Sequence, residues 1–331
     1  MSESVAASGG TAWRASAATT DERRAAPDWR RWLQLGLAGI WLLDAVLQYQ
    51  SFMFTKAFAQ MLGGTAAGNP AVIADPITWS ARLVDHHVVA FNAAFATIQL
   101  LLGLGIAWRP AVRIALGASI IWALAVWWLG EGLGGILTAG GASPLNGAPG
   151  AVIIYALLAV LLWPVARDRP APFVAGRAIG VQAARALWLV LWGSLAFFAL
   201  TPASRAPQAA SSMISGMAAG QPGWLAWVDN HAASALSHDG LAVSIVLAIA
   251  LIIVAVGLYL PPTAARATLV LALVLAALIW LAEGLGGILT GSGTDPNSGP
   301  LLALLALAYW PVAKVGLGHA ATPAPAVTGE Q

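Results

Sequence analysis

The chain has 331 residues, of which 59% are hydrophobic and only 9% are charged, and its mean hydropathy is +0.77. A soluble domain carries about 25% charged residues, so this composition excludes an ordinary water-soluble protein and points to lipid as the solvent. The absence of cysteine excludes disulfides, thiolate metal sites and cysteine-based redox chemistry.

Eight apolar stretches follow one another along the chain, and each is predicted to be a helix of an all-α integral membrane protein. They cover residues 33–51, 88–108, 114–129, 151–166, 186–201, 241–260, 267–282 and 301–313. Several are shorter than the ~20 residues that a bilayer span needs. Neighbouring Gly-rich segments can extend the short stretches, or these stretches form buried core helices of a bundle. Residues 1–30 are polar with no apolar core, so no cleavable signal peptide is predicted there.

The basic residues predict the orientation, because basic loops are retained on the cytoplasmic side. With a cytoplasmic N-terminus, every Lys and Arg except Lys56, Arg82 and Arg205 falls on the inner side. We therefore expect a multi-pass protein of a bacterial cell membrane with both termini in the cytoplasm. The pI near 9.3 then reflects topology, and no nucleic-acid partner is expected because the basic residues lie in separate loops.

An internal repeat predicts the domain organisation. The sequence EGLGGILT at residues 131–138 recurs unchanged at 283–290, an offset of 152, and WPVA at 163–166 recurs at 310–313. With four spans in each copy, both copies enter the membrane in the same direction, so they are parallel repeats related by a pseudo-twofold axis. The predicted parts are a disordered tail (1–30), a first four-helix repeat (31–166), a cytoplasmic linker (167–185), a second repeat (186–318) and a second tail (319–331). The long outer loops, residues 52–87 and 202–240, suit helices that lie in the membrane interface.

Two glutamates and two histidines occupy repeat-equivalent outer positions and form a candidate metal site. Glu131 and Glu283 end the third helix of each copy, while His86 and His238 stand at the entry to the second. Carboxylate and imidazole suit a borderline divalent metal ion or a proton relay. The alternative is structural: each carboxylate accepts backbone N–H groups of the tight glycine turn that follows it, and an interfacial histidine is simply solvated.

Asp44 lies inside the first apolar stretch, with Gln48 one turn further on, and these two residues with Gln99 form a candidate polar site. A charged residue in lipid costs about 2.5 to 3.5 kcal/mol, so Asp44 is expected to face the interior and pair with Gln99 or Asn92. The pairing is either a structural interhelical hydrogen bond or part of a ligand site. The second copy lacks this polar stripe, which favours a site in copy one only.

The tryptophans divide into two groups. Most stand near the ends of the apolar stretches, where aromatic side chains anchor membrane proteins at the interface. Trp122, Trp127 and Trp128 lie along the third stretch and either pack in the core or line a flat apolar pocket for a quinone or a lipid. Walker A, nucleophile-elbow, HExxH, CxxCH and Rossmann motifs are absent.

One span, an outer interfacial helix and three closely spaced spans form the predicted layout of each copy, with Gly103 and Gly105 late in the second span. This layout resembles the DoxX-like four-helix membrane proteins, which include the small subunit of thiosulfate:quinone oxidoreductase. The residues WLLD (41–44), FMF (52–54) and GEGLGG (130–135) are also similar to a group of actinobacterial multi-pass membrane proteins with no assigned function. The DoxX resemblance implies an accessory role beside a membrane redox system and maps no catalytic residue.

Two classes of function follow. In the first, the protein is an accessory or ligand-binding subunit of a membrane redox system, with an outer-face site and with a quinone, a metal ion or haem as cofactor. In the second, it is a carrier for a small solute or an ion. A carrier with parallel repeats is expected to have polar residues near the midplane of both copies. Because the second copy has almost none, the first class is preferred. No enzyme activity is predicted.

Overall fold

The computed structural model describes residues 28–138, 141–165 and 169–312, and within these ranges the chain forms helices and no β-strand. Five helices are long and apolar enough to cross a membrane. They are α5 (Val88–Ala107), α6 (Val112–Leu129), α9 (Val181–Ala199), α13 (Gly240–Gly257) and α14 (Pro262–Ala282). The described part of the chain is therefore that of a helical membrane protein.

The other three predicted stretches are also helices, but they differ from the five. Helix α2 (Trp29–Gln48) carries two arginines and an aspartate. Helices α7 (Ala151–Leu161) and α15 (Ser298–Ala308) have 11 residues each. At 1.5 Å per residue they are about 16 Å long, roughly half of a ~30 Å hydrocarbon core. Most of their residues are buried among the other helices of the bundle.

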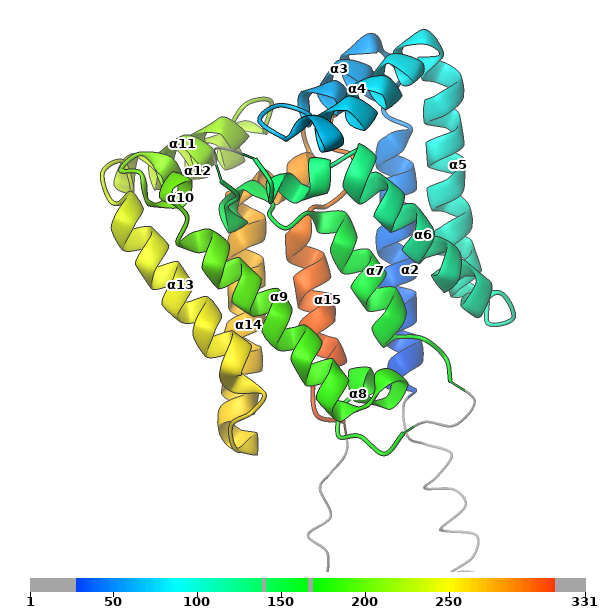
Figure 1. The fold of residues 1–331 in the computed structure, drawn as a ribbon, viewed down its shortest axis with the longest axis vertical. Helices are drawn as coiled ribbons and strands as arrows, with labels where there is room; N and C mark the ends of the chain where they lie inside the picture. Colours follow the sequence, from blue (N-terminus) through cyan, green and yellow to red (C-terminus); the bar gives the residue numbers. More distant parts are fainter. Residues whose placement is uncertain (1–27, 139–140, 166–168, 313–331) are drawn as a thin grey trace, which may run out of the picture.

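The two halves of the chain have matching element positions. Helices α2 and α9 begin 152 residues apart, as do α5 and α13, and α7 and α15 begin 147 residues apart. The packing partners also match: α2 packs on α5 as α9 packs on α13, and α6 packs on α7 as α14 packs on α15. The short helices α7 and α15 contact each other at the centre, and α15 also contacts α2 (Figure 1).

Short amphipathic helices gather at one end of the bundle (Figure 1). In the first half they are η1 (Ser51–Phe54), α3 (Lys56–Gly64) and α4 (Ala71–His86), and in the second half α10 (Pro202–Arg205), α11 (Ala209–Met217) and α12 (Gly223–Ala235). Helix α3 turns Phe58 inward against Met53 and Val84 and leaves Lys56 and Gln60 exposed. These helices occupy the segments that were predicted to be long outer loops.

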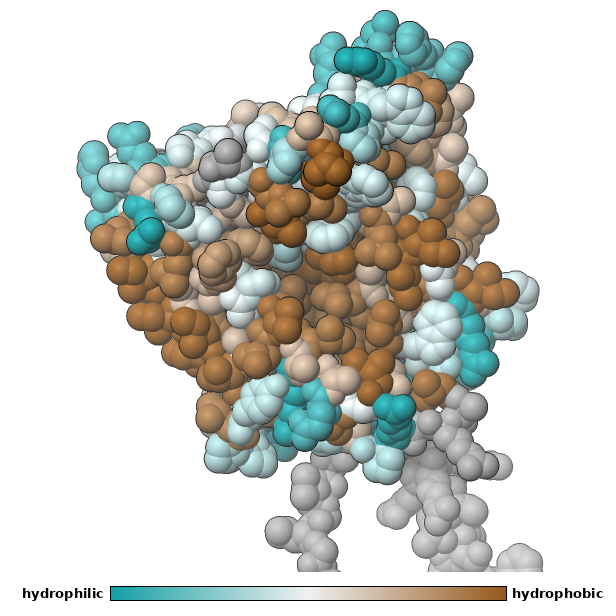
Figure 2. Space-filling model, viewed as in Figure 1, coloured by the Kyte–Doolittle hydropathy of each residue, from teal (hydrophilic) through white to brown (hydrophobic). Residues whose placement is uncertain are grey.

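The opposite end holds most of the described arginines. Helix α8 (Val174–Ile179) lies there, inside the predicted linker, and buries Val174 and Ala175 against the bundle. Arg31 at the start of α2 donates to the carbonyl oxygens of Ile106 and Ala107, the last residues of α5. Figure 2 shows a broad hydrophobic surface between the polar groups of the two ends. Arg14, Arg23, Arg24, Arg167 and Lys314 lie outside the described residues.

Candidate functional site

A left-handed glycine turn follows each of the two long helices α6 and α14. In η2 (Gly132–Gly135) and η4 (Gly284–Gly287) the glycines have positive φ angles, and so do Leu133 (56°) and Leu285 (54°). Glycine adopts this conformation without a steric penalty, which explains why the motif contains so many glycines. The turn reverses the chain at once, and a connection then leads into the short helix α7 or α15.

The two glutamates of the repeated motif cap these short helices. Glu131 accepts the backbone N–H of Val152 in the first turn of α7 (3.2 Å), and Glu283 accepts the hydroxyl of Ser298 at the start of α15 (2.7 Å). The structural interpretation expected N–H donors from the glycine turn. The donors belong to the next helix instead, because the turn folds the carboxyl group back onto that helix's N-terminus, where the first N–H groups have no partner within the helix.

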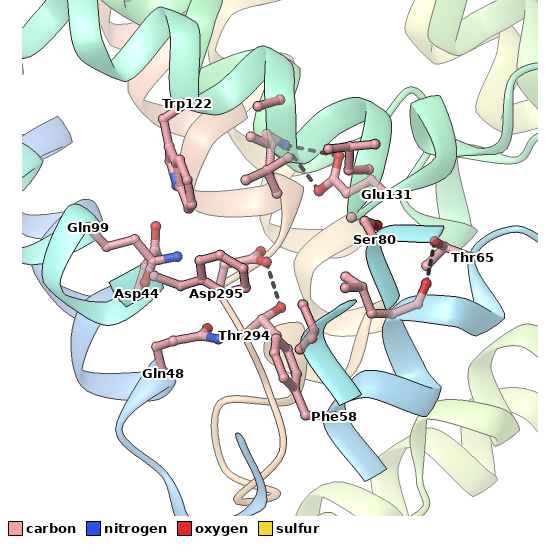
Figure 3. Close-up of a pocket in the computed structure, with 18 of the residues that line it drawn as sticks. Asp44, Gln48, Phe58, Thr65, Ser80, Gln99, Trp122, Glu131, Thr294 and Asp295 are labelled. Atoms are coloured by element: carbon pink, nitrogen blue, oxygen red, sulfur yellow. Dashed lines mark hydrogen bonds between the residues drawn. The ribbon is translucent and has the colours of Figure 1, made fainter. Parts of the chain in front are cut away.

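A cavity of about 230 Å³ lies beside Glu131 in the half of the bundle nearest the amphipathic helices (Figure 3). Its apolar wall comes from helices α2 to α7 and includes Trp41, Phe58, Phe95, Trp122 and Tyr155. The rings of Phe95 and Trp122 are 5.6 Å apart. The lining residues on α2 are confined to its last two turns, so the cavity extends from the end that carries the amphipathic helices only part of the way along the bundle.

Asp44 is the most deeply buried acid of this cavity, with 1% of its surface exposed. Its Oδ2 accepts a hydrogen bond from the Tyr155 hydroxyl of α7 (2.6 Å), while its Oδ1 is buried without a partner. The partner expected from sequence was Gln99 or Asn92. That expectation was wrong, because Asn92 pairs with Gln48 (2.6 Å).

The structure brings the three residues of the predicted polar site, Asp44, Gln48 and Gln99, to one cavity. They come from two neighbouring helices, α2 and α5, and all three are labelled in Figure 3. Gln99 has a buried Oε1 with no partner, and the indole N–H of Trp122 across the cavity also has none. Buried polar groups are nearly always paired, so unpaired groups on a cavity wall indicate a place for a ligand or water.

Two further lining residues come from the second half of the chain. Thr294 and Asp295 belong to the connection between η4 and α15 and reach the first half's cavity. The Asp295 carboxylate accepts the backbone N–H of Asn297 (2.7 Å) and the Thr294 hydroxyl (2.9 Å). Burial raises the pKa of the Asp295 carboxyl above its usual value, and the two hydrogen bonds oppose that rise.

The corresponding place in the second half is nearly filled. There Ala210, Met213 and Leu247 stand 152 positions after Phe58, Met61 and Phe95, and the void that they line has about 10 Å³. Leu145, from the first half's own outer connection, is also among its lining residues. At the positions of Asp44 and Gln99 the second half has Ala196 and Leu251. Among the described residues, a cavity of this size is therefore found beside the helices of the first half and not at the corresponding place in the second.

The predicted metal set does not come together. Glu131 lines the cavity and Glu283 is buried, but His86 and His238 are exposed to solvent. Among the described residues, no three His, Asp or Glu side chains lie close enough to hold a metal ion. The cavity lining contains no histidine, so it supplies no imidazole ligand for haem either. An oxidised quinone, which only accepts hydrogen bonds, is poorly matched to walls whose free groups are mostly acceptors.

The three tryptophans of α6 have three different environments. Trp122 lines the cavity, Trp127 donates its indole N–H to Pro149 O (2.7 Å), and Trp128 is exposed. Only Trp122 fits the predicted pocket.

The sequence did not predict Tyr155 and Asp295 as site residues. Neither has a counterpart in the other copy at the repeat offset.

Comparison of the chain with family models, with curated proteins and with solved structures gave no match.

Proposed function

We propose that the protein is a membrane ligand-binding protein whose first half holds a small, partly apolar molecule in its outer part. The observation that carries this proposal is Asp44, a buried carboxylate with one unpaired oxygen on the wall of a cavity with aromatic sides. Binding sites are typically apolar hollows with a few convergent polar groups. An acid in a membrane helix is a functional candidate by default.

The finer architecture belongs to the same proposal. Eight spans in two parallel four-helix repeats, with both termini cytoplasmic in a bacterial cell membrane, agree with the matching element offsets and with the arginines at one end. In this arrangement the second repeat is a scaffold that has lost the cavity. Its partners are the lipid bilayer and, following the DoxX resemblance, the proteins of a membrane redox system that it assists.

The alternative, a carrier for a small solute or an ion, is favoured by the acidic groups in the cavity. However, the cavity reaches only the outer part of α2 and ends near Trp41. The second half also lacks the polar positions that an alternating pathway between two repeats would use. A binding or accessory role accounts for a site confined to one end of the bundle and therefore ranks first.

The cavity wall offers a matched pair of variants for the test. Ala125 lines the cavity on α6, and Ala277 is its counterpart on α14; both are exposed. In purified protein in nanodiscs, we expect saturable binding of naphthalen-2-ylmethanol, a flat neutral alcohol. Ala125→Phe should weaken this binding at least tenfold, and Ala277→Phe should leave it unchanged. Equal binding by the two variants, or no saturable binding by the parent protein, would contradict the proposal.

A further inference from the structure

The cavity has an unusual charge balance. Its lining includes three carboxylic acids, Asp44, Glu131 and Asp295, and contains no Lys, Arg or His. Lys56 of α3 does not line the cavity and forms an ion pair at the surface, where its Nζ lies 3.7 Å from Asp85 Oδ2. A carboxyl group away from water either keeps its proton or pairs with a positive charge, and the lining residues supply no positive charge. A positively charged ligand would supply the positive charge that the lining residues do not.

The acids come from both halves of the chain and differ in their hydrogen-bond partners. Glu131 is engaged by the N-terminus of α7, whereas Asp44 keeps one free oxygen. Asp295 enters from the second half, held by Asn297 and Thr294, and Figure 3 shows its side chain in the same space as Asp44. Asp44 has a free oxygen, and each Asp295 oxygen accepts one hydrogen bond and has a further lone pair, so these two carboxylates can contact one ligand.

The remaining wall favours an organic cation over a metal ion. The rings of Trp41, Phe95, Trp122 and Tyr155 line the same space, and an aromatic face within about 6 Å attracts an ammonium group. A metal ion would demand several oxygen ligands around it, and among the described residues no three acids lie close enough together to hold one. The apolar surface is best matched by a guest with an apolar body.

The rim of the cavity also suits an amphiphile. Two lining residues are exposed at the surface: Met61 (41%) on the amphipathic helix α3 and Ala125 on the long helix α6. Both are apolar, and they lie where the outer helices meet the bundle. A molecule with an apolar body can therefore enter at this rim and bring its charged end to the acids inside the cavity.

We infer that the cavity binds an amphiphilic organic monocation, an amine or ammonium compound, between Asp44 of the first half and Asp295 contributed by the second. This inference rests on the proposed ligand-binding function and names its ligand class. It also gives the second half a direct part in binding, because its outer connection completes the site in the first half. The second half is then needed for binding, even though it has Ala196 and Leu251 at the positions of Asp44 and Gln99.

The test compares two probes of the same shape, naphthalen-2-ylmethylammonium and the neutral naphthalen-2-ylmethanol, on protein in nanodiscs at one pH. We expect the cation to bind at least tenfold more tightly than the alcohol. Asp44→Asn and Asp295→Asn should each reduce this preference to about threefold or less while binding of the alcohol persists. Asp239→Asn removes an exposed acid near the start of α13 and should leave the preference unchanged.

The outcomes separate this inference from the proposed function. Equal or tighter binding of the alcohol by the parent protein would overturn the cation assignment and leave a ligand site intact. A preference that survives Asp295→Asn would overturn the contribution of the second half. Each variant is first checked for an unchanged elution profile and melting temperature, and a variant that fails is replaced by Asp44→Glu or Asp295→Glu, for which we expect the cation preference to be retained.

Discussion

Glu131 and Glu283 stand just beyond the last residues of two long helices, where the helix dipole disfavours a negative charge. The structure resolves this conflict by folding each side chain onto the start of the following short helix. Glu283 is buried with 2% of its surface exposed, and its Oε2 has no hydrogen-bond partner. Burial raises the pKa of Glu283 to about 8, although the hydrogen bond from Ser298 opposes the rise.

The raised pKa predicts how stability depends on pH. The folded state holds a proton on Glu283 up to about pH 8, whereas the unfolded chain releases it near 4.5. The stabilisation from this group is therefore complete below pH 4.5 and is lost as the pH rises through 8, by on the order of a few kcal/mol. In Glu283→Gln the melting temperature should fall less between pH 5 and pH 8.5 than in the parent protein.

The control for this experiment is Asp239→Asn, which removes an exposed carboxyl and should reproduce the pH profile of the parent. Differential scanning fluorimetry in detergent gives the melting temperatures. Identical slopes for the parent protein and Glu283→Gln would show that Glu283 titrates alike in the folded and unfolded chain.

At the scale of elements, the left-handed turns η2 and η4 decide where the short helices α7 and α15 begin. Gly134 has φ +63°, and a methyl group on it would overlap the backbone of Pro149 and Gly150. The turn η2 directly follows Gly130 and Glu131, which line the cavity. The turn and the cavity are thus parts of one local arrangement.

We expect Gly134→Ala to be strongly destabilising, because it combines positive φ with a backbone clash. The yield of folded protein or its melting temperature should fall sharply, by more than the ~1 kcal/mol typical of a point substitution. Gly39→Ala is the control: Gly39 is exposed in α2 with open space around it, and alanine favours a helix by about 0.5 to 1 kcal/mol. Wild-type stability of Gly134→Ala would mean that the turn adopts another conformation.

At the scale of the whole molecule, the connection that precedes each short helix also contacts the other half of the chain. Thr294 and Asp295 of the second half line the first half's cavity, and Leu145 of the first half lines the small void in the second. The Thr201 hydroxyl at the start of α10 donates to Ala142 O of the first half's connection (3.0 Å). These contacts join the two halves at the end of the bundle that carries the amphipathic helices.

The proposed orientation can be tested directly, because the chain contains no cysteine. Gln60 is exposed on the amphipathic helix α3, and Thr263 is exposed at the start of α14, at the opposite end of the bundle. In intact cells a membrane-impermeant maleimide should label Gln60→Cys and should reach Thr263→Cys only after permeabilisation. The reverse pattern would invert the topology.

The sequence predicted part of the site, and there is a physical reason why it did not predict the other residues. Asp44, Gln48 and Gln99 stood out because polar residues are costly in apolar stretches. Tyr155 did not, since a tyrosine in a helix is ordinary. Asp295 lies in a loop 251 residues after Asp44, and no local pattern reports a contact over that separation. The grouping of Glu131 and Glu283 with His86 and His238 followed from repeat symmetry, but equivalent positions are not adjacent ones.

The sequence by itself determined that this chain is helical and membrane-like, where its helices run and that its two halves share a pattern, because hydrophobicity and periodicity are local properties. Tertiary structure alone decided that the glutamates cap the short helices, that Tyr155 is the partner of Asp44, and that the second half's loop enters the first half's cavity. These contacts join residues far apart in the chain, and only the packing of the bundle determines which of them meet.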